Sequence, residues 1–203
     1  MKIYSSIPSV YQSKDLINRS IIAFDKIDGS NIRVEGSIKT GFDKFGCRRH
    51  LIDRNTEMLG VAVNLFKEKE EKILEILSKN KLQGHELTLY FELFGKNSFA
   101  GKHEIEDKKD IYLIDVWIKK LGFIEPKEFI DLFSEVGIPK IIYSGILDQE
   151  FIDWVINNEE INEGVVCKST RKMKDGNIRM CKIKTGRWIE KVKSKFENYA
   201  DLI

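Results

Sequence analysis

Two strand-like stretches flank the segment FDKIDGSN, residues 24–31, and this pair of strands restricts the fold more than any other feature. Residues 20–27 and 31–36 are rich in β-branched and aromatic side chains, and the Asp-Gly-Ser between them is typical of a hairpin turn. The sequence therefore predicts an antiparallel hairpin here. A turn has no need of Lys26, which is either a solvated strand residue or a nucleophile.

The remaining patterns predict separate helices and further antiparallel strands. Apolar side chains at helical spacing predict helices over 61–80, 125–139 and 148–158. β-Branched and aromatic runs predict strands over 86–95 and 111–118, and a second hairpin over 163–169 and 177–184. Hairpins mixed with separate helices predict an α+β fold, with antiparallel sheets flanked by helices, and not a doubly wound parallel sheet.

Composition is that of a globular protein. The chain has 203 residues, of which 42% are hydrophobic and 33% charged, which favours a single domain over residues 1–203. Cys47, Cys167 and Cys181 lack C-x-x-C spacing, which favours reduced thiols over disulfides or a zinc site. The N-terminus has no apolar run typical of a secretory signal, and no run is long enough to span a membrane. These features predict a soluble, cytoplasmic protein without a membrane partner.

Positive charge is concentrated near the C-terminus, although the net charge of the chain is only +2. Residues 161–195 contain eleven Lys and Arg against three Asp and Glu, a net charge of +8. This segment is either a binding surface for a polyanion or a solvated basic face. Within it, alternation along a strand places Lys182 and Lys184 on one face, where two ammonium groups favour an anion between them. The alternative is an exposed edge strand protected by lysines.

Glu163 opens the strand before this lysine pair, with a glycine after it and Lys168 five residues on. A carboxylate beside paired lysines can hold a divalent metal while the lysines hold phosphate oxygens. The alternative is an ordinary cross-strand salt bridge. The sequence alone leaves both interpretations open.

Six segments appear in order: KIDG at 26–29, GCRRHLI at 46–52, YFELFG at 90–95, IYLIDVW at 111–117, NEGVVCK at 162–168 and MCKIKTG at 180–186. This series resembles the nucleotidyltransferase motifs of ATP-dependent RNA and DNA ligases and mRNA capping enzymes. YSSIPSVY near the N-terminus, ELFG, and KIKTGRWIEK are most similar to the RNA ligase 2 family. The resemblance covers almost the whole chain and implies an adenylation (nucleotidyltransferase) domain of the ATP-grasp-like ligase type.

The resemblance implies that Lys26 attacks the α-phosphorus of ATP and carries AMP. A lysine nucleophile must be neutral, and nearby cations lower a lysine pKa. Lys182 and Lys184 are expected to supply that charge and to hold the α-phosphate. Asp25 and the backbone of Ile27 are expected to read the adenine edge.

The resemblance also implies the remaining roles. Gly29 permits close backbone approach, and Glu92 binds the ribose hydroxyls. Asn31 organises a metal and its waters, with Glu163 as the metal-site carboxylate. Further phosphate contacts are expected from Lys168 and from Arg49, for which the arginine doublet leaves Arg48 as the alternative.

Two positions depart from the RNA ligase 2 pattern. Asp28 stands where those relatives usually have histidine and DNA ligases have aspartate. Ile114 stands before Asp115 where an aromatic ring normally stacks on adenine, so stacking is either aliphatic or supplied by a neighbour such as Tyr112 or Trp117.

The expected function is an ATP-dependent RNA ligase that uses Mg²⁺ or Mn²⁺ and joins a 5′-phosphate to a 3′-hydroxyl, with a nicked duplex as the expected substrate. The residues after 186 are too few for the C-terminal OB-fold domain that DNA ligases and capping enzymes carry, so we expect no such domain. The alternatives are a minimal DNA ligase and a non-catalytic nucleic-acid-binding module with this fold.

Overall fold

The computed structural model describes residues 2–82, 84–96, 108–173 and 176–195. Within them the backbone forms two compact units. The first contains residues 2–5 and the described parts of 29–96 and 108–138, and the second contains residues 6–28 and the described parts of 139–195. The sheets are antiparallel and the helices lie beside them, which confirms the predicted α+β class.

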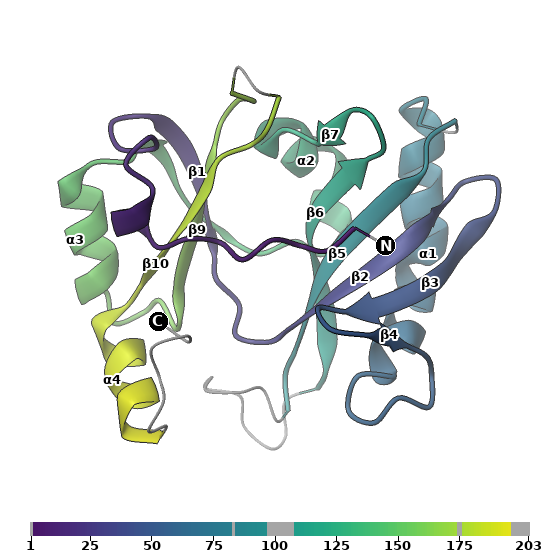
Figure 1. Cartoon of the computed structure of the whole chain (residues 1–203), viewed down its shortest axis with the longest axis horizontal. Helices are drawn as coiled ribbons and strands as arrows, with labels where there is room; N and C mark the ends of the chain where they lie inside the picture. The colour runs from purple at the N-terminus through teal and green to yellow at the C-terminus, as the bar shows by residue number, and fades with distance from the viewer. Residues whose placement is uncertain (1, 83, 97–107, 174–175, 196–203) are drawn as a thin grey trace. The chain divides into compact units, whose positions relative to one another are not determined.

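The first unit is built on a six-stranded sheet with the strand order β4-β3-β2-β5-β6-β7 (Figure 1). Its strands are β2 Ser30–Ser37, β3 Gly41–Cys47, β4 Leu51–Ile52, β5 Leu87–Phe94, β6 Asp110–Ile118 and β7 Gly122–Phe123. Its helices are α1 Val61–Lys79, α2 Pro126–Phe133 and the 3₁₀ turn η2 Ser134–Val136. Phe66 of α1 is fully buried and meets the rings of Phe42, Phe45 and Phe91 edge-on, so α1 covers one face of this sheet.

The second unit is built on a four-stranded sheet with the order β10-β9-β1-β8. Its strands are β1 Ser20–Asp25, β8 Ile141–Ile146, β9 Gly164–Ser169 and β10 Met180–Lys184. Its helices are α3 Gln149–Asn157, α4 Gly186–Lys195 and the 3₁₀ turn η1 Val10–Gln12. One face of the sheet packs its apolar side chains, Cys167 and Cys181 among them, against α3.

The first predicted hairpin is wrong. β1 pairs with β8 and β9, whereas β2 pairs with β3 and β5, so the two stretches belong to different sheets. β1 ends at Asp25, and Lys26 therefore lies in the connection between the sheets and not in a strand. The Asp-Gly-Ser signal is local, and the more extensive pairing of β1 with later strands overrides it.

The second predicted hairpin and the three helices are confirmed. β9 and β10 pair antiparallel with Cys167 opposite Cys181, although part of their connection lies outside the described residues. α3 is capped by Asp148, whose carboxylate accepts from the N–H of Phe151 at 2.9 Å. α2 begins at Pro126, and the turn after it ends at Gly137 with φ of +96°.

The three cysteines are buried free thiols, as predicted. No helix in the described part of the chain combines the length and the apolar character that crossing a bilayer requires.

Candidate functional site

Three charged side chains of the second unit meet at one carboxylate oxygen. The Nζ atoms of Lys26 and Lys184 lie 2.8 and 3.0 Å from Oε1 of Glu163. The side chains of Glu163 and Lys184 are only 4% and 7% exposed, whereas that of Lys26 is 23% exposed. One carboxylate faces two ammonium groups, so the cluster has an excess of positive charge, with Lys26 as its most accessible member.

Backbone hydrogen bonds hold this cluster in place. Lys26 follows the last residue of β1, and its N–H donates to the carbonyl of Gly164 at 2.9 Å. The N–H of Thr185 donates to the carbonyl of Glu163 at 3.1 Å, and Lys184 lies opposite Gly164 in the β9–β10 pair. The register of β1, β9 and β10 therefore brings together residues that are far apart in the sequence.

Lys184 is held in an environment that disfavours its charge. Burial lowers the pKa of Lys184 to about 8; Glu163 acts in the opposite direction, and Lys26 and Lys182 lower the pKa further. Its ammonium lies 3.6 Å from the ring centroid of Trp188 at the start of α4. The sequence interpretation did not include Trp188, because no helix was predicted after Lys184 and the burial of the ring depends on the tertiary fold.

Lys182 and Lys168 lie on the same face of the sheet as Lys184. The alternation predicted for β10 is observed, because Cys181 and Ile183 are buried in the core and Lys182 is half-buried on the opposite face. Lys168 is opposite Met180, is only 4% exposed, and places its ammonium 5.1 Å from the ring centroid of Phe24. Three lysines thus share the face that lies away from the core.

Asp25 and Ile27 flank Lys26. Burial raises the pKa of the Asp25 carboxyl, Lys140 opposes that shift, Glu163 adds to it and Lys26 opposes it. Ile27 is half-buried in the connection between the sheets. Asp28, the residue that departs from the RNA ligase 2 pattern, is buried with 5% exposed.

Asn31 and Glu92 form a cross-strand pair in the first unit. The Asn31 amide donates to the carbonyl of Phe91 at 3.4 Å, and both side chains are half-buried. Glu92 is also opposite Tyr112 of β6, whose ring packs on that of Phe94 with centroids 4.6 Å apart. An aromatic ring therefore lies next to the predicted ribose-binding carboxylate.

In the same unit, Gly29 makes a close backbone contact with β5, and Ile114 lies at a bulge in β6. A Cβ on Gly29 would lie 2.3 Å from the carbonyl oxygen of Leu93, so only glycine allows this approach of the chain to β5. Ile114 occupies a bulge in β6, between Leu113 opposite Phe91 and Asp115 opposite Tyr90. The half-buried Ile114 is thus offset from the regular alternation of the strand.

Arg48 and Arg49 lie in the turn between β3 and β4, and both are exposed. The turn is closed by the N–H of Cys47, which donates to the carbonyl of His50 at 2.9 Å.

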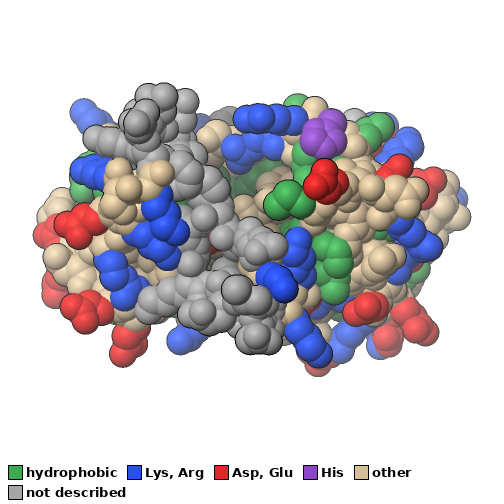
Figure 2. Space-filling view, turned by 90° about the horizontal axis from the view of Figure 1, so that it is seen from below, with side chains coloured by type: hydrophobic (Ala, Val, Ile, Leu, Met, Phe, Trp, Pro, Cys, Tyr) green, Lys and Arg blue, Asp and Glu red, His purple; other side chains and the backbone are tan. Residues whose placement is uncertain are grey.

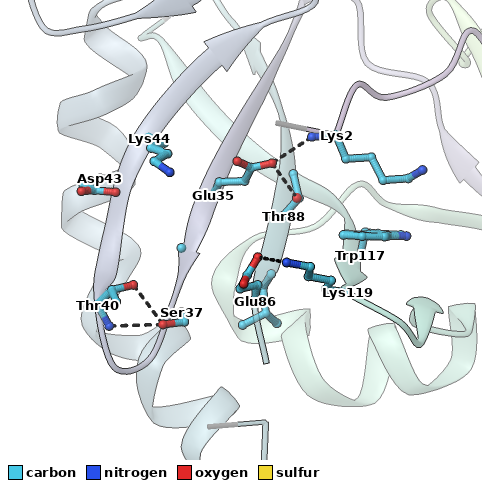
Figure 3. Close-up of a pocket in the computed structure, with 12 residues that line it drawn as sticks. Lys2, Glu35, Ser37, Thr40, Asp43, Lys44, Glu86, Thr88, Trp117 and Lys119 are labelled. Carbon is cyan, nitrogen blue, oxygen red and sulfur yellow. Dashed lines mark hydrogen bonds and ion pairs between the residues drawn. The ribbon is translucent and has the colours of Figure 1, made fainter. Parts of the chain in front are cut away.

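The other sequence candidate for base stacking, Trp117, lines a polar cavity of about 540 Å³ (Figure 3). This cavity lies at the Gly36–Leu87 end of the β2–β5 pair, at the opposite end from Asn31 and Glu92. The ammonium of Lys2 lies 5.1 Å from the Trp117 ring centroid. Of the two aromatic alternatives, Tyr112 is therefore the one beside Glu92.

The predicted site residues are divided between the units. Those of the first unit are Gly29, Asn31, Arg49, Glu92 and Ile114, and those of the second are Asp25, Lys26, Ile27, Glu163, Lys168, Lys182 and Lys184. Within the ranges that the structure describes, no group of three or more His, Cys, Asp or Glu side chains is arranged to hold a metal ion. Figure 2 shows one face of the molecule, on which Lys and Arg are interspersed with Asp and Glu.

The sequence model of the RNA ligase family matches residues 19–184. The chain belongs to the RNA ligase family. The match begins before β1 and ends at Lys184, so it includes every residue that the sequence predicted for the site. No curated protein sequence matches the chain.

Solved structures of an RNA ligase from Naegleria gruberi have a similar fold. A mutant with AMP and Mn gives a TM-score of 0.70 at 17% identity, over 96% of this chain and 59% of that chain. Another mutant, with ATP and Mn, gives 0.71 at 18% identity, over 96% and 58%. The same ligase with PPi gives 0.69 at 16% identity, over 96% and 59%. The chain therefore has the fold of an RNA ligase and spans about three fifths of the length of these relatives.

Proposed function

We propose that this chain is the adenylyltransferase domain of an ATP-dependent RNA ligase, with Lys26 as the nucleophile. The observation that carries the proposal is the cluster of Lys26, Glu163 and Lys184. In it the accessible amine of Lys26 and the buried ammonium of Lys184 contact the same carboxylate oxygen. Membership of the RNA ligase family supports the activity. The Naegleria ligase structures with ATP, AMP and Mn support ATP and a divalent metal as its cosubstrates.

The reaction proceeds through three phosphoryl transfers. Neutral Nζ of Lys26, having lost a proton to water, attacks the α-phosphorus of ATP; the bond to pyrophosphate breaks, and the nitrogen gives a second proton to water as the P–N bond forms. An oxygen of an RNA 5′-phosphate then attacks the AMP phosphorus, and the P–N bond to Lys26 breaks. Finally a 3′-hydroxyl gives its proton to water and attacks the 5′-phosphate, AMP leaves, and a phosphodiester bond remains.

The protein's own residues position these groups. Lys182 and Lys184 hold the α-phosphate and stabilise the negative charge that develops on it. Glu163 orients the two ammonium groups of Lys26 and Lys184 before ATP binds. Asp25 and Ile27 contact the adenine edge, while Lys168 and Arg49 contact phosphate oxygens.

Ribose and metal recognition completes the proposed site. Glu92 binds the ribose hydroxyls, Tyr112 or Ile114 contacts the base, and Gly29 keeps the backbone close to β5. Mg²⁺ needs only one or two carboxylates when water and substrate phosphates supply the remaining ligands. Glu163 offers one carboxylate and Asn31 a polar side chain for the metal's waters, so these residues fit a metal that arrives with ATP and neutralises phosphate charge.

Incubation with α-labelled ATP or α-labelled GTP and a divalent metal tests the proposal. We expect an acid-labile AMP adduct that survives denaturing electrophoresis and maps to Lys26 by peptide mass spectrometry. Labelling from GTP in preference to ATP would indicate a capping-type enzyme. No adduct from either nucleotide would favour the non-catalytic binding module.

The second expectation concerns the sugar at the break. A ribonucleotide 2′-hydroxyl and A-form pucker align the attacking 3′-oxygen, so we expect a ribo-ended nick to seal on the order of a hundredfold faster than an all-DNA nick. Sealing of four nicked duplexes, which vary the sugar on each side of the break, measures this. Equal rates on all four would make the minimal DNA ligase the better interpretation, in agreement with Asp28.

A third expectation concerns the basic helix α4. Reversing the charge of Lys191 and Lys193 should reduce the salt dependence of RNA binding, the slope of log K against log salt, by about two, and should leave self-adenylylation largely intact. The matched control reverses Lys39 and Lys127, two exposed lysines of the first unit. Equal loss of RNA binding and adenylylation would mean that the α4 lysines support the nucleotide site instead.

A further inference from the structure

Arg33 of β2 is a buried cation whose donors lack acceptors. The residue is 6% exposed, and within the described residues its Nε and Nη1 atoms have no hydrogen-bond partner. A buried guanidinium is costly unless its N–H groups are paired, because it has lost its hydration. The sequence interpretation missed it, since Arg33 alternates with the core residues Ile32 and Val34 and therefore has the pattern of a solvated strand position.

Two acidic residues lie near Arg33 in the sheet, Glu35 two residues along β2 and Asp115 opposite Tyr90, and each has other hydrogen-bond partners. Glu35 accepts from the backbone N–H of Lys2 at 2.8 Å and from the hydroxyl of Thr88 at 3.4 Å, which directs it toward β5. Asp115 accepts from the hydroxyl of Tyr4 and lies on β6, with β5 between it and β2. The Nε and Nη1 donors of Arg33 therefore have no acceptor among the described residues.

The guanidinium lies over Gly46 on the opposite side, toward β3. The position that a Cβ on Gly46 would occupy is 2.9 Å from Nε and 3.3 Å from Nη2 of Arg33, and 3.1 Å from the carbonyl oxygen of His50. Glycine at 46 thus makes room for the guanidinium against the turn that carries Arg48 and Arg49.

Arg33 is also close to the proposed nucleotide site. It shares a face of β2 with Asn31, two residues earlier and roughly 7 Å along the strand. The Nε and Nη1 donors of Arg33 are desolvated, and guanidinium N–H groups match phosphate oxygens in geometry. A bound oxyanion would supply the missing hydrogen-bond acceptors.

We propose that Arg33 binds a phosphate group, with its unpaired N–H groups donating to phosphate oxygens beside the turn of Arg48 and Arg49. The ligand class is a phosphate monoester or a polyphosphate. The evidence for the anion site is the burial and the unpaired donors of Arg33. Only the source of the phosphate rests on the proposed function. This source is either the 5′-phosphate of an RNA end or the phosphates of ATP.

The first experiment measures thermal unfolding of the wild type, Arg33→Met and Arg54→Met in chloride, phosphate and pyrophosphate at equal ionic strength. Arg54 is an exposed arginine of the same unit and serves as the control. We expect phosphate and pyrophosphate to raise the Tm of the wild type and of Arg54→Met. Arg33→Met should unfold at the wild-type temperature or above it in chloride, because an unpaired buried charge is removed, and should lose the anion-dependent rise.

Three outcomes would overturn the anion site. They are an anion-dependent rise that persists in Arg33→Met, no rise in the wild type, and a Tm of Arg33→Met in chloride well below that of the wild type. Should Arg33→Met fail to fold, Arg33→Lys provides the second measurement: it keeps the charge but not the planar donor set, and should weaken pyrophosphate binding about tenfold or more. Failure of both variants to fold would assign Arg33 to the structure and not to a ligand.

The second experiment identifies the source of the phosphate. Binding of nicked RNA with a 5′-phosphate or a 5′-hydroxyl, and separately of ATP, is compared between the wild type and Arg33→Met. Loss of the preference for 5′-phosphate with ATP binding intact assigns the site to the RNA end, and the reverse assigns it to ATP. If the chain forms no AMP adduct but Arg33→Met still loses the phosphate-dependent Tm shift, the proposed function fails while the anion site stands.

Discussion

Replacing Lys26 with arginine is expected to lower self-adenylylation by more than about a thousandfold, because arginine stays protonated and has no neutral amine to attack phosphorus. Arginine keeps a positive charge that can pair with Glu163, so the fold should be preserved. Lys26→Ala should lose the adduct equally, and it leaves Glu163 paired with Lys184 alone. Transfer of label from α-labelled ATP to each protein, followed by denaturing electrophoresis, measures the effect.

A matched control separates chemistry from charge. Lys140→Arg changes an exposed lysine close to Asp25 in the same unit, and it should form the adduct at a rate close to that of the wild type. Thermal unfolding of Lys26→Arg should stay close to wild type as well. Undiminished labelling of Lys26→Arg would remove Lys26 from the role of nucleophile and leave the cluster with Glu163 as a structural ion-pair network.

Local signals in the sequence were sufficient for most of the secondary structure. The helix cap at Asp148, the proline at the start of α2 and the turn glycine after it act within a few residues, so the pattern and the structure agree. The β9–β10 hairpin is also local, because only ten residues separate its strands. Antiparallel sheets flanked by helices could be predicted on these grounds.

Pairing between distant segments could not be predicted from local patterns. β1 has its partners more than a hundred residues later, in β8 and β9, and so the turn signal after Asp25 led to the wrong hairpin. The close contact of Gly29 with Leu93 depends on the same long-range arrangement, in this case of β2 with β5. Neither has a sequence signature of its own.

In the candidate site too, local patterns predicted the residues, whereas their contacts depend on pairing between distant segments. Ordered motifs selected Lys26, Glu163 and Lys184 as residue types, but only the register of β1, β9 and β10 shows that one carboxylate oxygen accepts both ammonium groups. Trp188 under Lys184 and the buried Arg33 were missed because each follows the period of its helix or strand. What distinguishes them is burial, which depends on the tertiary fold.

Gly164→Ala is expected to destabilise the protein by about 3 kcal/mol or more, the sum of backbone strain and overpacking. Gly164 has φ of +151°, and a Cβ there would lie 2.1 Å from the carbonyl oxygen of Ile183 and 2.8 Å from Cα of Lys184. Both neighbours are backbone atoms of β10, so they cannot move without separating the two strands. Denaturant unfolding of the variant and the wild type measures the difference.

The same substitution should also abolish adenylylation at temperatures where the variant is still folded. The strands that a Cβ would separate carry Glu163 and Lys184 at the same end of the pair, directly before β9 and at the end of β10, and the carbonyl of Gly164 accepts from the N–H of Lys26. Gly84→Ala is the control, because no heavy atom lies within 4 Å of its added Cβ, and both stability and adduct formation should stay close to wild type. A Gly164→Ala protein with wild-type stability and full labelling would show that the close approach of β9 and β10 is not what aligns the two lysines on Glu163.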